Sequence, residues 1–350
     1  MSTWTVTAMG VDLTSRLVSL SEIVETKDVL LAKSTLFAGQ AAAVLDDADG
    51  ALSGPLGLFK ARDWANGDFS ITRDGVALFQ GFIRAVPLGG SKKRTADVVA
   101  ENVLARATDA YVSVKATRAN PAAVALAILE AAGLAAYIDY PSFKAAALAS
   151  RRVAATISVD TGTAQATATD MLASISDLCS ITFIATGTQI RAQAFAPYQG
   201  SGANCKRALT DDTVDKFGEL EWDQEAFYNE IILRWGDDKT ATARAASSAA
   251  ADRGWRTAKI NATDSSKVVV ADAGSAAYFA RTYLARAAYQ RMVLTAEAGS
   301  DFTDARTGDR HLVTSAPLGL TAKAFEIIEV SRKLSTDSVG LRLVSLPDPA

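Results

Sequence analysis

The stretch that most constrains the fold is DFSITRDGVALFQGFI, residues 68–83. Apolar residues alternate with polar ones around Asp74-Gly75, and an Asp-Gly pair in this setting is a strong signal for a two-residue β-hairpin. Such a turn would place Ile71 opposite Leu78. A further strand is predicted at 96–101, followed by a short helical turn. The first part of the chain is therefore predicted to be an antiparallel β domain with one brief helix.

The middle of the chain changes to helical patterns. Asn120-Pro121 is a typical helix start, a capping residue followed by proline at the first helical position, and Gly133 supplies a C-terminal stop. A second helix is predicted to begin near residues 161–163, and a hairpin with its turn at Thr186-Gly187 follows at 181–194. The second helix has one apolar face with three- and four-residue spacing, formed by Met171, Leu172, Ile175 and Leu178.

Strand patterns return after Phe217. Residues 227–235, FYNEIILRW, alternate between two faces and are predicted to form a strand with one buried side. The Ala/Ser-rich stretch 240–252 is expected to be a mobile loop or a weak helix. A helix is predicted at about 273–286, and the last two strands, 323–334 and 338–346, are predicted to pair around a turn at Thr336-Asp337.

Length and charge set the broad class. A chain of 350 residues with 49% hydrophobic content is long enough for two or three domains with sizeable cores. The formal net charge of −3 gives no general reason to expect nucleic-acid or membrane binding. The N-terminal residues lack a basic head followed by an apolar run, and no apolar segment approaches the ~20 residues needed to cross a bilayer. We therefore expect a globular protein in a cytosol-like environment, without stable membrane insertion.

The two cysteines, Cys179 and Cys205, are too few for a disulfide scaffold. The sequence contains no CxxC pair and no Cys/His cluster that would indicate zinc. An iron–sulfur cluster needs four thiolates, which this chain does not have. We expect two reduced thiols, no metal and no cofactor.

An acidic stretch, AVLDDADGALSG, occupies residues 43–54. A calcium loop would alternate oxygen ligands and end on glutamate, but Ala48 interrupts the acids and the twelfth position from Asp46 is Gly57. The flanking residues offer no partner that would separate carboxyl pKa values for catalysis. We predict that a strand ends at Leu45 and that Asp46, Asp47 and Asp49 belong to an Asx-type turn closed by Gly50.

Enzymatic chemistry finds little support in the sequence. His311 is the only histidine, and it lies where a turn leads into a strand. The motifs GxSxG, HExxH, GxGxxG and the P-loop are absent. Carboxylate pairs could still act as in glycosidases, and the middle segment supplies a few acids: Glu130, Asp139, Asp160, Asp170, Asp177, Asp211 and Asp212. No aromatic-rich cleft signature accompanies them, so we predict a structural role for His311 and for the acids.

A sugar-binding module is a third class, because such sites use exposed aromatic platforms. The chain has five tryptophans: Trp4, Trp64, Trp222, Trp235 and Trp255. Trp235 lies on the alternating face of a predicted strand and is assigned to the core. Trp255 lies in a predicted loop and is the better binding candidate, although a rim or subunit-contact role is the simpler reading of it.

The strand end AAAVLDDADGALSGP, followed by the hairpin ending ALFQGFI, resembles the start of phage tail baseplate hub and tail-tip proteins. In that family a Leu-Asp-Asn-x-Asp-Gly strand end precedes a Leu-Phe-x-Gly ending, and this chain has Asp47 where Asn is commoner. The matching residues are Leu45, Asp46, Ala48, Asp49, Gly50, Leu78, Phe79 and Gly81. The helix and hairpin at 169–195, the YNEIILRW strand and the late TGDRHLVTSAPLGL occur in the order expected of such hubs.

The resemblance implies a structural, non-enzymatic hub in the baseplate of a phage virion, assembled in the cytoplasm of the host bacterium. It implies a homotrimer around the tail axis with two β tube-like domains per chain. The corresponding boundaries are 1–110 for the first β domain, 111–215 for a mixed α/β insertion and 216–350 for a second β domain with one helix.

The implied partners are distal tail or tail tube proteins, the tape-measure protein and tip or fibre proteins. DNA would pass through the ring without specific binding, and we expect few basic side chains to line the passage. The alternatives are a distal tail adaptor, which would be sixfold, and a glycan-binding or peptidoglycan-cleaving tail-tip protein.

Overall fold

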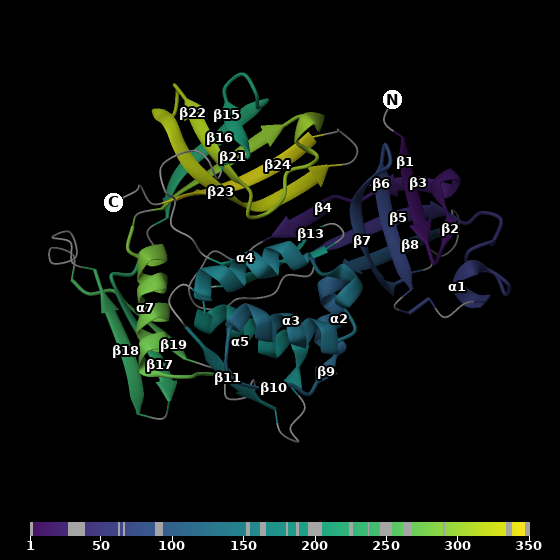
Figure 1. The fold of residues 1–350 in the computed structure, drawn as a ribbon. Coiled ribbons are helices and arrows are strands. Elements are labelled where there is room, and N and C mark those ends of the chain that lie inside the picture. Colours follow the sequence, from purple (N-terminus) through teal and green to yellow (C-terminus); the bar gives the residue numbers. More distant parts are fainter. Residues whose placement is uncertain are drawn as a thin grey trace.

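The computed structural model describes residues 3–26, 39–61, 64–65, 67–87, 94–151, 155–161, 166–179, 181–186, 189–194, 205–223, 227–236, 238–245, 254–261, 268–289, 291–333 and 338–346. These residues form a largely antiparallel β protein with a smaller helical part (Figure 1). The predicted predominance of antiparallel β-structure is confirmed.

The strands of the first 102 residues form what we call the first β unit. They are β1 (Trp4–Ala8), β2 (Val11–Asp12), β3 (Leu17–Leu20), β4 (Ile23–Thr26), β5 (Gln40–Asp46), β6 (Asp68–Arg73), β7 (Val76–Ala85) and β8 (Thr95–Asn102). The short helix α1 (Leu58–Ala61) lies between β5 and β6, and α2 (Arg106–Asp109) follows β8. Inward-facing residues of alternating strands, such as Val6, Ile71 and Val98, form one apolar core.

The predicted hairpin is β6 and β7. Asp74 and Gly75 have φ values of 50° and 80°, as the turn with two left-handed residues requires. The predicted register is wrong by one residue, because the pairing shifts between Ile71 and Thr72 and brings Ile71 opposite Phe79. A β-bulge of this kind inserts one extra residue into one strand, which the alternation of the sequence alone did not reveal.

The middle of the chain supplies three longer helices: α3 (Pro121–Ala131), α4 (Tyr140–Arg151) and α5 (Ala168–Cys179). The predicted cap is confirmed, since Asn120 Oδ1 accepts hydrogen bonds from the backbone N–H groups of Ala122 and Ala123. The predicted start of α5 near residues 161–163 is wrong, because Ala166 still pairs in a strand with Val112. The predicted apolar face of α5 is fully buried. Helix α4 was not predicted.

Small strands complete this part: β9 (Tyr111–Val112), β10 (Lys115–Ala119), β11 (Ile157–Asp160), β12 (Ala166–Thr167), β13 (Ile181–Thr186) and β14 (Gln189–Ala194). Strands β13 and β14 are the predicted hairpin, and its turn residue Gly187 lies outside the described residues.

A second small sheet and a long helix pack against the same middle part. The sheet consists of β17 (Glu230–Gly236), β18 (Lys239–Arg244) and β19 (Thr257–Asn261), and the helix is α7 (Ala273–Ala287). Strand β20 (Val268–Val270), which precedes α7, pairs with β11 in the sheet of β10 and β11. The expectation of a loop or helix at 240–252 is wrong for 240–244, which form β18 by pairing with β17; residues 246–252 lie outside the described part. One apolar core takes residues from α3 and α5 and from β17 and α7.

The remaining strands form the second β unit: β15 (Arg207–Thr210), β16 (Lys216–Asp223), β21 (Arg291–Ala298), β22 (Arg310–Ser315), β23 (Leu320–Lys333) and β24 (Ser338–Ser345). The predicted pairing of the last two strands is confirmed as β23 with β24, while their predicted turn at 336–337 lies outside the described residues. This unit has its own core, which includes Leu294, Phe325 and Leu343.

The two β units join edge to edge. Strand β4 pairs antiparallel with residues 329–332 of β23, so one sheet runs without interruption from β16 through β23 and β4 to β8 and beyond (Figure 1). The predicted domain boundaries after 110 and 215 stay a prediction. The strands β17 to β20 and helix α7, which come between β16 and β21 in the sequence, share one apolar core with the middle part.

Both β units repeat one strand order. In the first unit the strands lie in the order β4-β5-β8-β7-β6-β1, and in the second β16-β21-β24-β23-β22-β15. The β7–β8 pairing shifts register between Ile83 and Ala85, and the β23–β24 pairing shifts between Ile327 and Glu329, at the corresponding place. The outer strands differ, since β1 runs antiparallel to β6 whereas β15 runs parallel to β22.

Candidate interaction surface

One exposed face of the sheet crosses both β units. Residues paired directly across neighbouring strands point to the same side of a sheet. One row of such residues runs from β16 to β8: Lys216, Glu297, Gly340, Ser331, Val24, Gln40 and Glu101. None of them is buried. We call this side of the sheet the open face.

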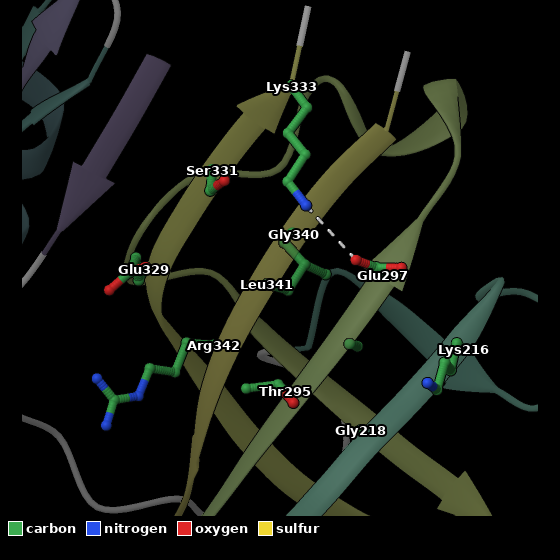
Figure 2. A pocket seen from close by; sticks show the side chains of 11 residues that line it. Lys216, Gly218, Thr295, Glu297, Glu329, Ser331, Lys333, Gly340, Leu341 and Arg342 are labelled. Carbon is green, nitrogen blue, oxygen red and sulfur yellow. Dashed lines mark ion pairs between the residues drawn. The ribbon is translucent and has the colours of Figure 1, made fainter. Parts of the chain in front are cut away.

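The open face is hollowed over the second β unit, with a cavity volume of about 330 Å³ (Figure 2). Small residues make the hollow, since a Cβ atom added at Gly218 would collide with Thr295 Oγ1. Lys333 Nζ lies 3.6 Å from Glu297 Oε1. Among the residues that the structure describes, the lining carries three cations and two carboxylates, a nearly balanced set: Lys216, Lys333, Arg342, Glu297 and Glu329.

A second hollow of about 390 Å³ lies on the first β unit. Its lining includes Val24 and Gln40 of the same row, and Glu22 is the one charged residue among its described lining residues. The two hollows therefore belong to one shallow surface on the open face. Neither of them gathers the nucleophile, base and oxyanion donors that an enzyme site requires.

A buried ion pair lies at the junction of the two units, on the other side of the sheet. Arg332 Nη1 donates to Glu25 Oε1 at 3.0 Å, and the two residues are 2% and 5% exposed. The same guanidinium donates to the backbone carbonyls of Ala305 and Thr303. Burial lowers the pKa of Arg332, and the nearby Glu25 carboxylate acts in the opposite direction by raising it. The guanidinium stays protonated in either case, because an arginine side chain remains charged in proteins. Sequence reasoning missed this pair, because no local pattern joins residues 307 positions apart.

The acidic stretch is the predicted turn. Asp46 Oδ1 accepts from Ala48 N at 3.0 Å, and Asp49 Oδ1 accepts from Ala51 N at 3.0 Å. Arg16 binds Asp49 through two nitrogens, and this hydrogen-bonded partner lowers the pKa of Asp49 to about 2. Asp47 is buried and accepts from the backbone N–H groups of the following loop, Leu52 and Ser53.

Gly50 closes that turn with φ of 72°, a region that costs L-residues energy. We expect Gly50→Val to lower the free energy of unfolding by roughly 1–3 kcal/mol, measured by urea denaturation. Ala51→Val at the next position is the matched control. Calcium or EDTA is expected to leave the melting temperature unchanged, and a large rise with calcium would contradict the structural assignment.

His311 lies in β22 and is fully buried. Neither imidazole nitrogen has a hydrogen-bond partner among the described residues. Its cross-strand neighbour is Phe325, and the nearby charges belong to Asp309, Lys206 and Arg207. Burial lowers the pKa of His311, because the apolar surroundings disfavour the charged ring. The lone histidine is thus enclosed in the second core, away from both hollows.

The lowered pKa of His311 gives stability a pH dependence. In the unfolded chain the ring takes up a proton below about pH 6.5, whereas the folded protein resists it. The free energy of unfolding should therefore fall as pH drops below about 6.5 and be unaffected by this group above it. We expect urea denaturation at pH 7 and 5.5 to show a smaller loss for His311→Phe than for the native chain; an equal loss would contradict the assignment.

The remaining candidates are dispersed. Asp139 accepts from Arg191 at 3.0 Å, Glu130 accepts from the Tyr140 hydroxyl, and Asp211 binds the Ser315 hydroxyl at 2.7 Å. No group of three or more His, Cys, Asp or Glu that could hold a metal ion occurs in the described ranges. Cys179 is buried and Cys205 is half-buried, and both are free thiols.

Two of the tryptophans are largely exposed. Trp255 is 52% exposed, and the guanidinium of Arg244 lies 5.2 Å from its ring centroid. Trp222, on β16, is 57% exposed. Trp235 is half-buried beside Lys239. Among the described helices, none has the length and apolar character needed to cross a membrane.

No protein-family model matches the sequence, and no curated protein matches it. Solved structures do match. A tail protein from Neisseria meningitidis is 12% identical with a TM-score of 0.61, covering 99% of this chain and 97% of its own. A 43 kDa tail protein of prophage MuSo2 from Shewanella oneidensis is 11% identical with a TM-score of 0.57 over the full length of both chains.

A third solved structure is the E. coli c3393 protein, 12% identical with a TM-score of 0.53, which covers 98% of this chain and 77% of its own. That protein is described as a type VI secretion system component with structural similarity to the T4 tail proteins gp27 and gp5. The likeness to all three extends over nearly the whole chain. The resemblance read from the sequence is therefore confirmed at the level of the fold: this chain has the fold of phage tail proteins.

Proposed function

We propose that the chain is a structural hub protein of a phage tail baseplate, and that three copies form a ring around the tail axis. The observation that carries the proposal is the repeated strand order and register of the two β units. Two similar units per chain let three copies present six similar positions. Such a ring could join a sixfold tail tube to threefold parts of the tip.

The proposed domains follow the predicted order, 1–110, 111–215 and 216–350, with one refinement. The second β unit is interrupted after β16 by the segment that contains β17, β18, β19 and α7, which packs with the insertion. Both β units would build the ring. The insertion would project from it and offer surface to other tail proteins.

The open face would line the passage for DNA. It is continuous across the joined units and lies opposite the packed cores. The described lining of its hollow carries three cations against two carboxylates, which is nearly balanced but includes more basic side chains than the sequence predicts for the passage. A polyanion can slide past such a wall, whereas a basic wall would bind phosphates and release counterions at each contact. The proposed role is passive and non-enzymatic, in the baseplate of a virion assembled in the bacterial cytoplasm. The proposed neighbours are tail tube or distal tail proteins, the tape-measure protein and tip or fibre proteins.

We expect the purified chain to form trimers at high concentration, and a tail reconstruction to show three copies in one ring. Light scattering across a concentration series measures the first, and the symmetry of the reconstruction measures the second. Three copies follow if each β unit fills one of six similar positions. A ring of six chains would overturn the hub assignment and favour the distal tail adaptor.

A further inference from the structure

Strand β16 is an edge strand with an unfinished apolar side. Among the described strands it pairs only with β21. Trp222 lies opposite Met292 and Leu220 lies opposite Leu294, so both side chains are on the same side of the sheet as the second core. Trp222 is nevertheless 57% exposed, because no strand covers it on its outer flank. An exposed edge of this kind is a template for another strand.

The backbone of Trp222 also points outward. Met292 N donates to Ser345 Oγ at 2.8 Å, which directs the Met292 N–H away from β16. In an antiparallel ladder the Trp222–Met292 pair is then a non-hydrogen-bonded pair, and the N–H and C=O of Trp222 face the free edge. A partner strand would satisfy both groups.

The repeat shows what the corresponding strand of the first unit does. In the first unit, β3 and β4 together occupy the position that β16 has in the second unit. They pair with β5 in the same register as β16 pairs with β21. The matched pairs are Ser19–Val44 with Lys216–Glu297, Leu20–Ala43 with Phe217–Ala296, and Val24–Gln40 with Glu221–Val293. Trp222 therefore corresponds to Glu25. That residue pairs with Val330 of β23 at the junction inside the chain.

Strand β7 offers the matching edge. Ile83 N donates to Gly67 O at 2.8 Å, just as Ile327 N donates to Asp309 O at 2.8 Å. After these residues, the pairing of β7 with β8 and the pairing of β23 with β24 each shift register. The residues of β23 that follow the shift pair with β4. The residues of β7 and its continuation that correspond to Glu329 and Val330 are Ala85 and Val86.

The backbone at that end of β7 suits a new partner. Asp97 N donates to Pro87 O at 3.0 Å, so the Pro87 carbonyl faces β8. Because the backbone groups alternate between the two flanks, the N–H that proline lacks would also have faced β8. The N–H and C=O of Val86 face the opposite flank, where β4 lies in the matching junction.

We infer that β16 of one copy pairs antiparallel with the end of β7 of a second copy. The register places Trp222 opposite the partner's Val86, and Asp223 opposite the partner's Ala85. The junction between two copies would thus resemble the β4–β23 junction within one chain. An apolar contact between Trp222 and Val86 would take the place of the buried ion pair between Glu25 and Arg332. The inference rests on the proposed function, since it supplies the contact that closes three copies into a ring.

Cysteine pairing tests the register. In a chain with Cys205→Ser, the pair Ala85→Cys and Asp223→Cys is expected to form disulfides between copies under mild oxidation, giving covalent dimers and trimers on a denaturing gel. Ala85→Cys with Glu221→Cys is the matched control, because it displaces one thiol by two residues, about 7 Å. Equal cross-linking of both pairs, or none of the first, would overturn the register.

A second measurement tests the anchor. Trp222→Lys is expected to weaken trimer formation at least tenfold in light scattering, with the melting temperature of the monomer unchanged because Trp222 is exposed there. Trp255→Lys, at a similarly exposed tryptophan in the loop before β19, is expected to leave the trimer intact. A trimer that tolerates Trp222→Lys and does not cross-link overturns this junction and leaves the proposed ring standing. A native chain that stays monomeric at every concentration overturns both.

Discussion

Replacing Arg332 with methionine is expected to lower the free energy of unfolding by about 3–5 kcal/mol. The change leaves the Glu25 carboxylate buried at the junction of the two β units without its cationic partner, and Glu25 Oε2 already has no hydrogen-bond partner among the described residues. It also removes the bonds that Arg332 donates to the Thr303 and Ala305 carbonyls. Urea denaturation of the purified monomer measures the loss.

Two variants separate this effect from a general loss of charge. Arg118 pairs with Asp272 at 2.7 Å on the surface, where its side chain is 65% exposed. Arg118→Met should therefore cost at most about 1 kcal/mol. The double variant Glu25→Gln and Arg332→Met should recover part of the loss, because no unpaired charge remains. A loss for Arg332→Met as small as that for Arg118→Met would mean that the junction does not hold the two units together.

Features set by neighbours along the chain could be predicted from the sequence. Three such features are the Asp-Gly turn, the Asn120 cap and the apolar face of α5. Each depends only on residues that lie a few positions apart in the sequence. The turn that contains Asp46 and Asp49 belongs to the same class, since both carboxylates accept hydrogen bonds from nearby backbone groups.

Features set by distant partners could not be predicted. Strand β18 has a composition typical of a loop, and it is a strand because β17 lies beside it. The bulge that moves Ile71 opposite Phe79 depends on how β7 meets both of its neighbours. The β4–β23 junction joins the two ends of the chain and has no local signal.

The same limit applies to the interaction surface. The sequence singled out Trp255 as the exposed tryptophan, and the exposure of Trp222 became visible only once β16 was placed at an edge. The open face combines residues from both β units, and their common side follows from strand register. Alternation shows that a strand has two faces, but not which of them the rest of the chain covers.

Reversing two charges on the open face is expected to turn a passive wall into a DNA-binding one. Glu297 and Glu329 are the two carboxylates among the described residues of the hollow, beside Lys216, Lys333 and Arg342. Glu297→Lys with Glu329→Lys would make all five charges positive in every copy. If the face lines the ring, the affinity for linear duplex DNA at physiological salt should rise by roughly 10²-fold or more, with a steeper dependence on salt, because each new phosphate contact releases a counterion.

Fluorescence anisotropy with labelled duplex, across a salt series, measures this affinity on the assembled ring. Glu130→Lys with Asp170→Lys is the matched control, because it adds the same charge on helices α3 and α5 of the insertion. If the control variant bound DNA as tightly as the open-face variant, the gain would come from net charge and not from the position of the face. Tight binding by the native ring at the same salt would contradict a passive conduit, since three cations against two carboxylates would then already be enough to hold DNA in place.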